Sequence, residues 1–139
     1  MIVLDASVAA SWLLGERPVP IGMELFTSNP DTAIVVPSHW PLEISNTLRT
    51  HLRAGRISIA DFHNIMDRLD LLTISVQPSI DLDEIGPLAQ FSVTHGLTTY
   101  DAVYVQLALQ QRATLATLDR AMRRASTALN VLLLPAQAP

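Results

Sequence analysis

Residues 96–119 read GLTTYDAVYVQLALQQRATLATLD, and this segment sets the class of fold that we expect. It contains a helix start, an apolar helix over about 99–111, a short apolar strand over 114–117, and a second helix start. Helix, strand and helix in close succession are typical of an α/β protein. Each helix start carries an acid, Asp101 in the first and Asp119 in the second. The role of these two acids is the main question that the segment raises.

The rest of the chain continues the same alternation. Short apolar runs predict strands, and apolar residues three and four positions apart predict helices. We expect strands at about 2–4, 33–36, 73–76, 114–117 and 131–134, and helices at about 6–14, 21–26, 41–53, 58–72, 82–95, 99–111 and 119–128. This order predicts a three-layer α/β/α sandwich with a mostly parallel sheet of about five strands. We expect a single domain over 1–135 and a short tail at 136–139.

The composition excludes several classes of protein. Among 139 residues, 49% are hydrophobic and 16% are charged, so we expect some apolar surface to face a partner. All nine basic residues are arginine, which excludes a P-loop and a Schiff-base lysine. No cysteine is present, so thiolate chemistry and disulfides are excluded. There is neither an apolar run of about 18 residues nor a signal peptide, and we expect a cytoplasmic protein without a membrane partner.

Four acids stand close to predicted strand ends or helix starts: Asp5, Glu43, Asp101 and Asp119. Each one taken alone has an ordinary explanation, because acids cap helix N-termini and interact favourably with the helix dipole. Thr98 and Asp101 even have the spacing of a capping box. All four, however, have apolar neighbours that a surface cap does not need. Parallel strands direct ligands to their carboxyl ends, so these acids are also candidates for one shared site.

Carboxylates gathered at a half-buried edge repel one another, and a divalent cation relieves that repulsion. Oxygen ligands of this kind suit Mg²⁺ or Mn²⁺, which also bind substrate phosphates. Such a site can hydrolyse a phosphodiester bond without lysine or cysteine. Ser7 follows Asp5 by two residues and Thr117 precedes Asp119 by two, so these hydroxyls are candidates for holding the carboxylates or metal waters. Local turn bonding is the alternative for both.

At these residues the sequence resembles the PIN-domain ribonucleases, and within them the VapC group of toxins from type II toxin–antitoxin modules. The matching segments are MIVLDASVAASWLL, VVPSHWPLEISNTLR and HGLTTYDAVYVQLALQQRATLATLDRAM, which occur in the family's order. The resemblance implies a metal-dependent endoribonuclease that is inhibited by a cognate antitoxin protein and is usually a homodimer. The residues to which it assigns the site are Asp5, Glu43, Asp101 and Asp119, with Ser7, Thr117 and Asn46 in supporting roles.

Two other interpretations of the sequence remain possible alternatives. The first is a non-catalytic PIN-like module that binds a partner protein or RNA and uses its acids only as helix caps. The second is a phosphoryl-acceptor domain of the receiver or haloacid dehalogenase kind. That second reading is weakened by the absence of lysine and by the sequence Asp5-Ala6-Ser7, which lacks the D-x-D pattern after the first strand.

Arginine residues and one apolar stripe complete the candidate functional features. Arg49 and Arg53 lie on the predicted helix of Glu43 and are candidates for RNA phosphate contact, with a solvated helix face as the alternative. Arg120, Arg123 and Arg124 follow Asp119 and have the same two explanations. The stripe of Phe62, Ile65, Met66 and Leu69 is either core or an antitoxin groove.

Overall fold

The computed structural model describes residues 1–15 and 31–136. It contains a five-stranded, all-parallel sheet whose strands lie in the order β3-β2-β1-β4-β5. The strands are β1 (Ile2–Leu4), β2 (Ile34–Val36), β3 (Ile74–Val76), β4 (Thr114–Ala116) and β5 (Leu133–Leu134). The predicted mostly parallel sheet of about five strands is confirmed.

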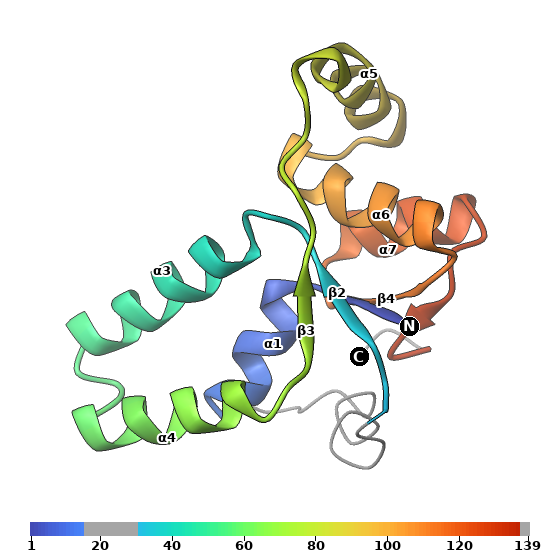
Figure 1. The fold of residues 1–139 in the computed structure, drawn as a ribbon. Coiled ribbons are helices and arrows are strands. Elements are labelled where there is room, and N and C mark those ends of the chain that lie inside the picture. The colour runs from blue at the N-terminus through green and yellow to red at the C-terminus, as the bar shows by residue number, and fades with distance from the viewer. Residues whose placement is uncertain (16–30, 137–139) are drawn as a thin grey trace.

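Helices cover both faces of the sheet (Figure 1). They are α1 (Ala6–Leu13), α3 (Trp40–Arg53), α4 (Ile59–Asp70), α5 (Ile85–His95), α6 (Thr99–Gln111) and α7 (Arg120–Ala128), with a 3₁₀ turn, η1, at Leu82–Glu84. Helix α1 contacts α3 and α4, whereas α6 contacts α5 and α7, so the helices form two separate layers. The predicted three-layer sandwich is therefore present. The helix expected at 21–26 lies outside the described residues.

The core forms where apolar strands meet the inner faces of both helix layers. Every residue of β1 and β2 is buried, as expected for strands covered on two faces. Leu4, Leu115 and Val105 are fully buried and belong to the same apolar cluster, which joins β1, β4 and α6. This packing fixes α6 against the first strand.

Most predicted ends agree with the structure within two residues, and local chemistry explains them. Ser58 and Asp61 form the expected capping box at the start of α4. Gly96 ends α5 in the left-handed conformation, with φ of 64°, which glycine adopts without strain. The helix expected over 82–95 begins instead as the 3₁₀ turn η1, and Pro87 then falls in the first turn of α5. Strand β5 starts two residues later than predicted, and it pairs with β4 through Leu133 and Leu134.

The sheet order places a topological switch point beside β1. The chain passes from β1 to β2 on one side, and it later returns to place β4 on the other side. Ligands of open parallel sheets bind at such a crevice, beyond the carboxyl ends of the strands. Asp5 and Thr117 follow the two strands that flank this crevice. No helix among residues 1–15 and 31–136 is both long and apolar enough to cross a membrane.

Candidate active site at the switch point

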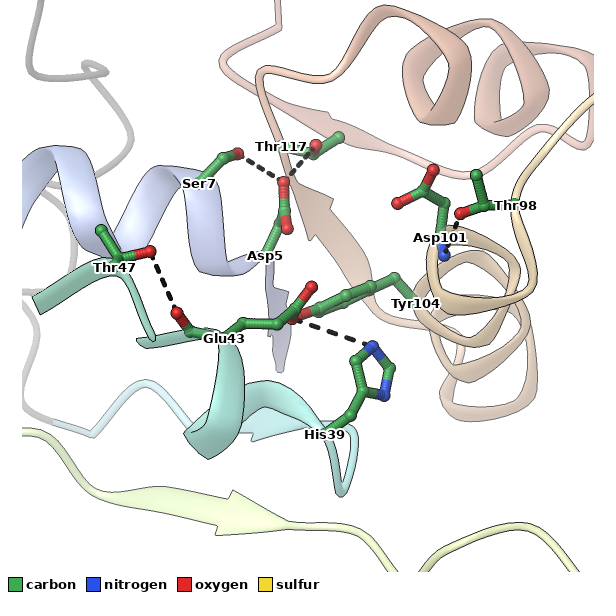
Figure 2. A network of polar contacts seen from close by, with 9 residues as sticks. All are labelled: Asp5, Ser7, His39, Glu43, Thr47, Thr98, Asp101, Tyr104 and Thr117. Atoms are coloured by element: carbon green, nitrogen blue, oxygen red, sulfur yellow. Dashed lines mark hydrogen bonds and ion pairs between the residues drawn. The ribbon is translucent and has the colours of Figure 1, made fainter. Parts of the chain in front are cut away.

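Asp5 lies directly after β1 and is the most deeply buried of the four acids, with 4% of its surface exposed. Its Oδ2 atom accepts hydrogen bonds from the hydroxyls of Ser7, at 2.5 Å, and Thr117, at 2.8 Å (Figure 2). Asp5 occupies the N-cap position of α1, but its side chain makes no capping hydrogen bond there. The structure thus brings both predicted hydroxyls onto Asp5, and the carboxylate is oriented by them.

Burial raises the pKa of the Asp5 carboxyl, because the charged form loses its hydration. The hydroxyl of Ser7, the hydroxyl of Thr117 and the backbone N–H of Ser7 lower this pKa, but they do not offset the burial. The negative charge of Glu43 raises the pKa of Asp5 further. A buried carboxylate that is also repelled by a second carboxylate favours either a proton or a nearby cation.

Glu43 lies in the first turn of α3 and is held by residues from two parts of the chain. The hydroxyl of Tyr104, from α6, donates a short hydrogen bond to Glu43 Oε2. His39 lies one turn before Glu43, with its Nε2 atom 3.8 Å from the same oxygen (Figure 2). Neither Tyr104 nor His39 is among the site residues predicted from the sequence. The available signal is a tyrosine three residues after Asp101 on an apolar helix, because a buried phenol needs a hydrogen-bond partner.

Tyr104 is almost completely buried, with 1% of its surface exposed. Burial raises the pKa of the Tyr104 phenol, and its hydrogen bond to Glu43 raises it again. The negative charges of Asp5 and Glu43 add to the same upward shift in pKa. The phenol therefore stays protonated and serves as a donor, and its surroundings carry a negative potential.

Asp101 is half-buried in the first turn of α6. Its backbone N–H donates to the hydroxyl of Thr98 at 3.2 Å, so Thr98 caps the helix. The capping box that the spacing of this pair allowed as the alternative is only half formed, since the Asp101 carboxylate makes no return bond within the described residues. Figure 2 shows this carboxylate directed toward the side on which Asp5 lies.

Asp119 has a clear local role. Its Oδ1 atom accepts the backbone N–H of Met122 at 2.8 Å, and it is the N-cap of α7. The backbone N–H of Asp119 itself donates to the Thr117 hydroxyl at 3.0 Å. Thr117 therefore bridges Asp119 and Asp5, and one Asp119 oxygen is committed to capping.

The predicted supporting residue Asn46 and the two candidates for RNA contact, Arg49 and Arg53, are all exposed on α3. Arg49 also lines an apolar cleft of about 430 Å³ between α3 and α4. Three residues of the predicted apolar stripe, Phe62, Met66 and Leu69, line this cleft and are half-buried. Ile65 is buried in the core, and the other three side chains pack against the core from the cleft side, so a core role is observed for the whole stripe.

Arg123 fits neither prediction made for it. Its guanidinium is buried, with 8% of the residue exposed, and donates to the carbonyl of Thr117 at 3.0 Å and of Pro135 at 2.8 Å. Both acceptors are backbone oxygens that lie beyond β4 and β5. Arg123 therefore links the two strand ends from inside, and it is not a solvated or phosphate-contacting residue.

All four acids offer carboxylate oxygens, which are the ligands that a hard divalent cation prefers. Burial and the charge of Glu43 raise the pKa of Asp5, so a cation beside this carboxylate would stabilise its charged form. Among residues 1–15 and 31–136, however, no group of three or more acidic, histidine or cysteine side chains is close enough to hold a metal ion. Asp5 and Glu43 interact directly through their charges, Asp101 faces them, and Asp119 is linked through Thr117.

Polar residues beyond the carboxyl ends of parallel strands, at a switch point, place this chain among the open α/β proteins that bind their ligands there. Residues 2–128 match the PIN domain family, and the chain belongs to that family. PIN domains are generally metal-dependent nucleases.

Solved structures support the same fold. The structure of PAE2754 from Pyrobaculum aerophilum superimposes with a TM-score of 0.67 at 22% identity, covering 95% of this chain and 82% of that one. FitAcB from Neisseria gonorrhoeae superimposes with a TM-score of 0.55 at 18% identity, covering 96% of each chain. The comparison with curated proteins gave no match.

Proposed function

We propose that this protein is a metal-dependent endoribonuclease that hydrolyses RNA phosphodiester bonds and acts as the toxin of a toxin–antitoxin pair. The observation that carries the proposal is the Asp5 carboxylate. It is buried at the switch point, oriented by two hydroxyls, and repelled by Glu43 without a cationic side chain to compensate it in the described residues. A carboxylate in this position is suited to a cation and its phosphate ligand.

The four acids would hold the ion: Asp5, Glu43, Asp101 and Asp119. When bound, Mg²⁺ or Mn²⁺ supplies Lewis acidity toward the phosphoryl oxygen and lowers the pKa of an attacking water. Ser7 and Thr117 keep the Asp5 carboxylate in one orientation, and Thr117 also fixes the backbone of Asp119. The Tyr104 hydroxyl donates to Glu43 Oε2 and so fixes one oxygen of the Glu43 carboxylate.

The direct test is cleavage of a structured RNA by the purified protein. We expect cleavage with Mg²⁺ or Mn²⁺, none after exhaustive dialysis against EDTA, and full recovery when Mn²⁺ is added back. An RNA pattern that is unchanged in excess EDTA would refute metal dependence. A parallel digest of single-stranded DNA measures the preference for RNA.

Asp119 allows capping to be separated from metal binding. Asn caps helices as well as Asp does, whereas Ala at an N-cap costs about 1 kcal/mol. We therefore expect Asp119→Asn to retain wild-type stability but lose cleavage. We expect Asp119→Ala to lose cleavage and also about 1 kcal/mol of stability. Melting curves and RNA cleavage on the same samples check this. Wild-type cleavage by Asp119→Asn would restrict Asp119 to its capping role.

Arg49 and Arg53 are exposed on the helix that carries Glu43, and we propose that they contact RNA phosphates. For single-stranded nucleic acid, affinity falls with salt, and each lost phosphate contact reduces the magnitude of that negative log–log slope by roughly 0.7. We expect a decrease of this size in Arg49→Ala and in Arg53→Ala. Arg112→Ala is the control, since Arg112 is exposed at the far end of α6. Equal slopes in all three variants and in the wild type would disprove the contact.

A non-catalytic PIN-like module that binds a partner protein or RNA is the second candidate. It is favoured by Asp119, whose carboxylate visibly caps α7, and by the lack of a preformed group of three ligands in the described residues. Binding of RNA without cleavage at any Mg²⁺ or Mn²⁺ concentration would favour this second function.

The proposed protein partner is a cognate antitoxin, and a homodimer is the proposed assembly. The half-buried apolar side chains that line the cleft between α3 and α4 supply a surface suited to an apolar peptide segment. The neighbouring gene is informative: a small upstream reading frame that begins with a DNA-binding domain favours the toxin over a stand-alone nuclease. Light scattering of the purified chain measures the assembly.

A further inference from the structure

Tyr104 joins two helices that are distant in the sequence. It lies on α6, it is 1% exposed, and its hydroxyl donates to Glu43 on α3, 61 residues away. A buried phenol requires a hydrogen-bond partner, and here the partner is one of the proposed metal ligands rather than a backbone carbonyl. The contact therefore couples the position of α6 to the orientation of a carboxylate at the switch point.

Glu43 needs such support because of its own chemistry. Its side chain has three rotatable bonds and is 38% exposed, so in isolation it would sample many rotamers. Tyr104 fixes its Oε2 atom, and the ring of His39 packs edge-on against Tyr104, with centroids 5.2 Å apart and planes at 78°. His39 also packs against Tyr100, at 5.6 Å between centroids. Tyr104 and His39 therefore lie beside the same Glu43 oxygen, and Tyr100 contacts only the ring of His39 among these residues.

We infer that Tyr104 is a positioning residue for Glu43, and that its hydroxyl holds the Glu43 carboxylate toward Asp5 before a cation binds. This inference rests on the proposed function, because it assigns a role to Tyr104 in the same site. The entropy lost in ordering Glu43 is then lost on folding rather than on metal binding. Hydrogen-bond donors to metal ligands generally change metal affinity by 10–100-fold when they are removed.

Tyr104→Phe tests this role with little disturbance, because the ring and its packing stay and only the hydroxyl is lost. The matched control is Tyr100→Phe, which removes a hydroxyl from the same helix. Tyr100 is 67% exposed, and its ring still packs against His39 in the variant. Far-ultraviolet circular dichroism and melting curves establish that each variant is folded before metal is added.

The measurement is the Mn²⁺ dissociation constant of metal-free protein, obtained by electron paramagnetic resonance of free Mn²⁺. We expect Tyr104→Phe to weaken Mn²⁺ binding by about tenfold and Tyr100→Phe to leave it unchanged. RNA cleavage by Tyr104→Phe should need about tenfold more Mn²⁺ for half-maximal rate, and saturating Mn²⁺ should restore the rate. Because each variant is first shown to be folded without metal, rescue by saturating Mn²⁺ reports weaker metal binding and not a loss of the fold.

A double-mutant cycle assigns the effect to the contact itself. In a Glu43→Ala background there is no carboxylate to position, so adding Tyr104→Phe should change the Mn²⁺ dissociation constant by less than about twofold. Equal Mn²⁺ affinity in wild type and Tyr104→Phe, or additive losses in the double variant, would overturn the inference and leave the proposed nuclease intact. A wild-type protein that binds no Mn²⁺ would overturn both.

Discussion

Replacing Asp5 by Asn is expected to abolish RNA cleavage and, in the metal-free protein, to raise the free energy of unfolding at neutral pH. The activity is lost because the amide has no charge for the cation. The stability rises because Asp5 is buried, its pKa is raised by burial and by Glu43, and its ionised form is unfavourable in the fold. The Asn carbonyl oxygen can still accept the hydroxyls of Ser7 and Thr117, so the local structure is retained.

The stability difference between wild type and Asp5→Asn is expected to depend on pH. Since the folded-state pKa of Asp5 is raised above its unfolded value, its contribution to stability is complete below the unfolded pKa and is lost as pH rises through the folded pKa. Wild type and Asp5→Asn should therefore converge in stability in acid and diverge toward neutral pH in EDTA. Denaturant unfolding at several pH values measures this. Excess Mn²⁺ should reverse the order, by stabilising only the wild type.

Asp61 provides a control with the opposite sign. It is an exposed acid whose pKa is lowered by hydrogen bonds from the backbone and hydroxyl of Ser58. Its contribution to stability is present above the unfolded pKa and is lost as pH falls through the folded pKa. Asp61→Asn should therefore not stabilise the metal-free protein at neutral pH. If both Asn variants stabilised the protein equally, net charge and not the buried site would be the cause.

Arg123→Ala is expected to destabilise the protein by roughly 2–4 kcal/mol, because it removes charge-assisted hydrogen bonds to two buried or half-buried carbonyls. For a chain of this size, the corresponding fall in Tm is on the order of 10 °C. Thermal unfolding by circular dichroism measures this loss.

The control for Arg123→Ala is Arg124→Ala, the neighbouring residue on α7, which is exposed and should change stability by no more than about 0.5 kcal/mol. Arg123→Lys keeps the charge but loses the planar fork that reaches both carbonyls, so it should be intermediate. An Arg123→Ala variant with wild-type Tm would show that the two strand ends do not depend on this side chain.

The elements of this fold were predictable because their signals are local. The apolar run of β1, the capping box of Ser58 and Asp61, and the stop at Gly96 each act within a few residues. The sheet order was not predictable in this way, because it depends on which strands meet after the chain has passed over the sheet. The parallel α/β class follows from alternation alone, whereas the placement of β4 beside β1 requires tertiary packing.

In the candidate site, too, only the residues with a local sequence signal could be predicted. Asp5 was identifiable because it directly follows a strand, Asp119 because it starts the helix after the next predicted strand end, and Ser7 and Thr117 because each stands two residues from one of these acids. The contact of Tyr104 with Glu43 spans 61 residues and has no local signature beyond a tyrosine on an apolar helix. The prediction for Arg123 was wrong because an arginine beside other arginines usually lies on a solvated surface. Its hydrogen-bond acceptors lie 6 and 12 residues away, and no local pattern indicates that they meet it.

The most direct test of a single cation site formed by the four acids is a Mn²⁺ titration of wild type and Asp101→Asn, with RNA cleavage measured on the same samples. Asp101 is the acid whose convergence on Asp5 depends entirely on how α6 packs. We expect the wild type to bind Mn²⁺ and cleave RNA, and Asp101→Asn to melt normally in EDTA, bind Mn²⁺ at least about tenfold more weakly and leave RNA intact. Full cleavage by a folded Asp101→Asn variant, or a wild type that binds no Mn²⁺, would contradict the proposed site.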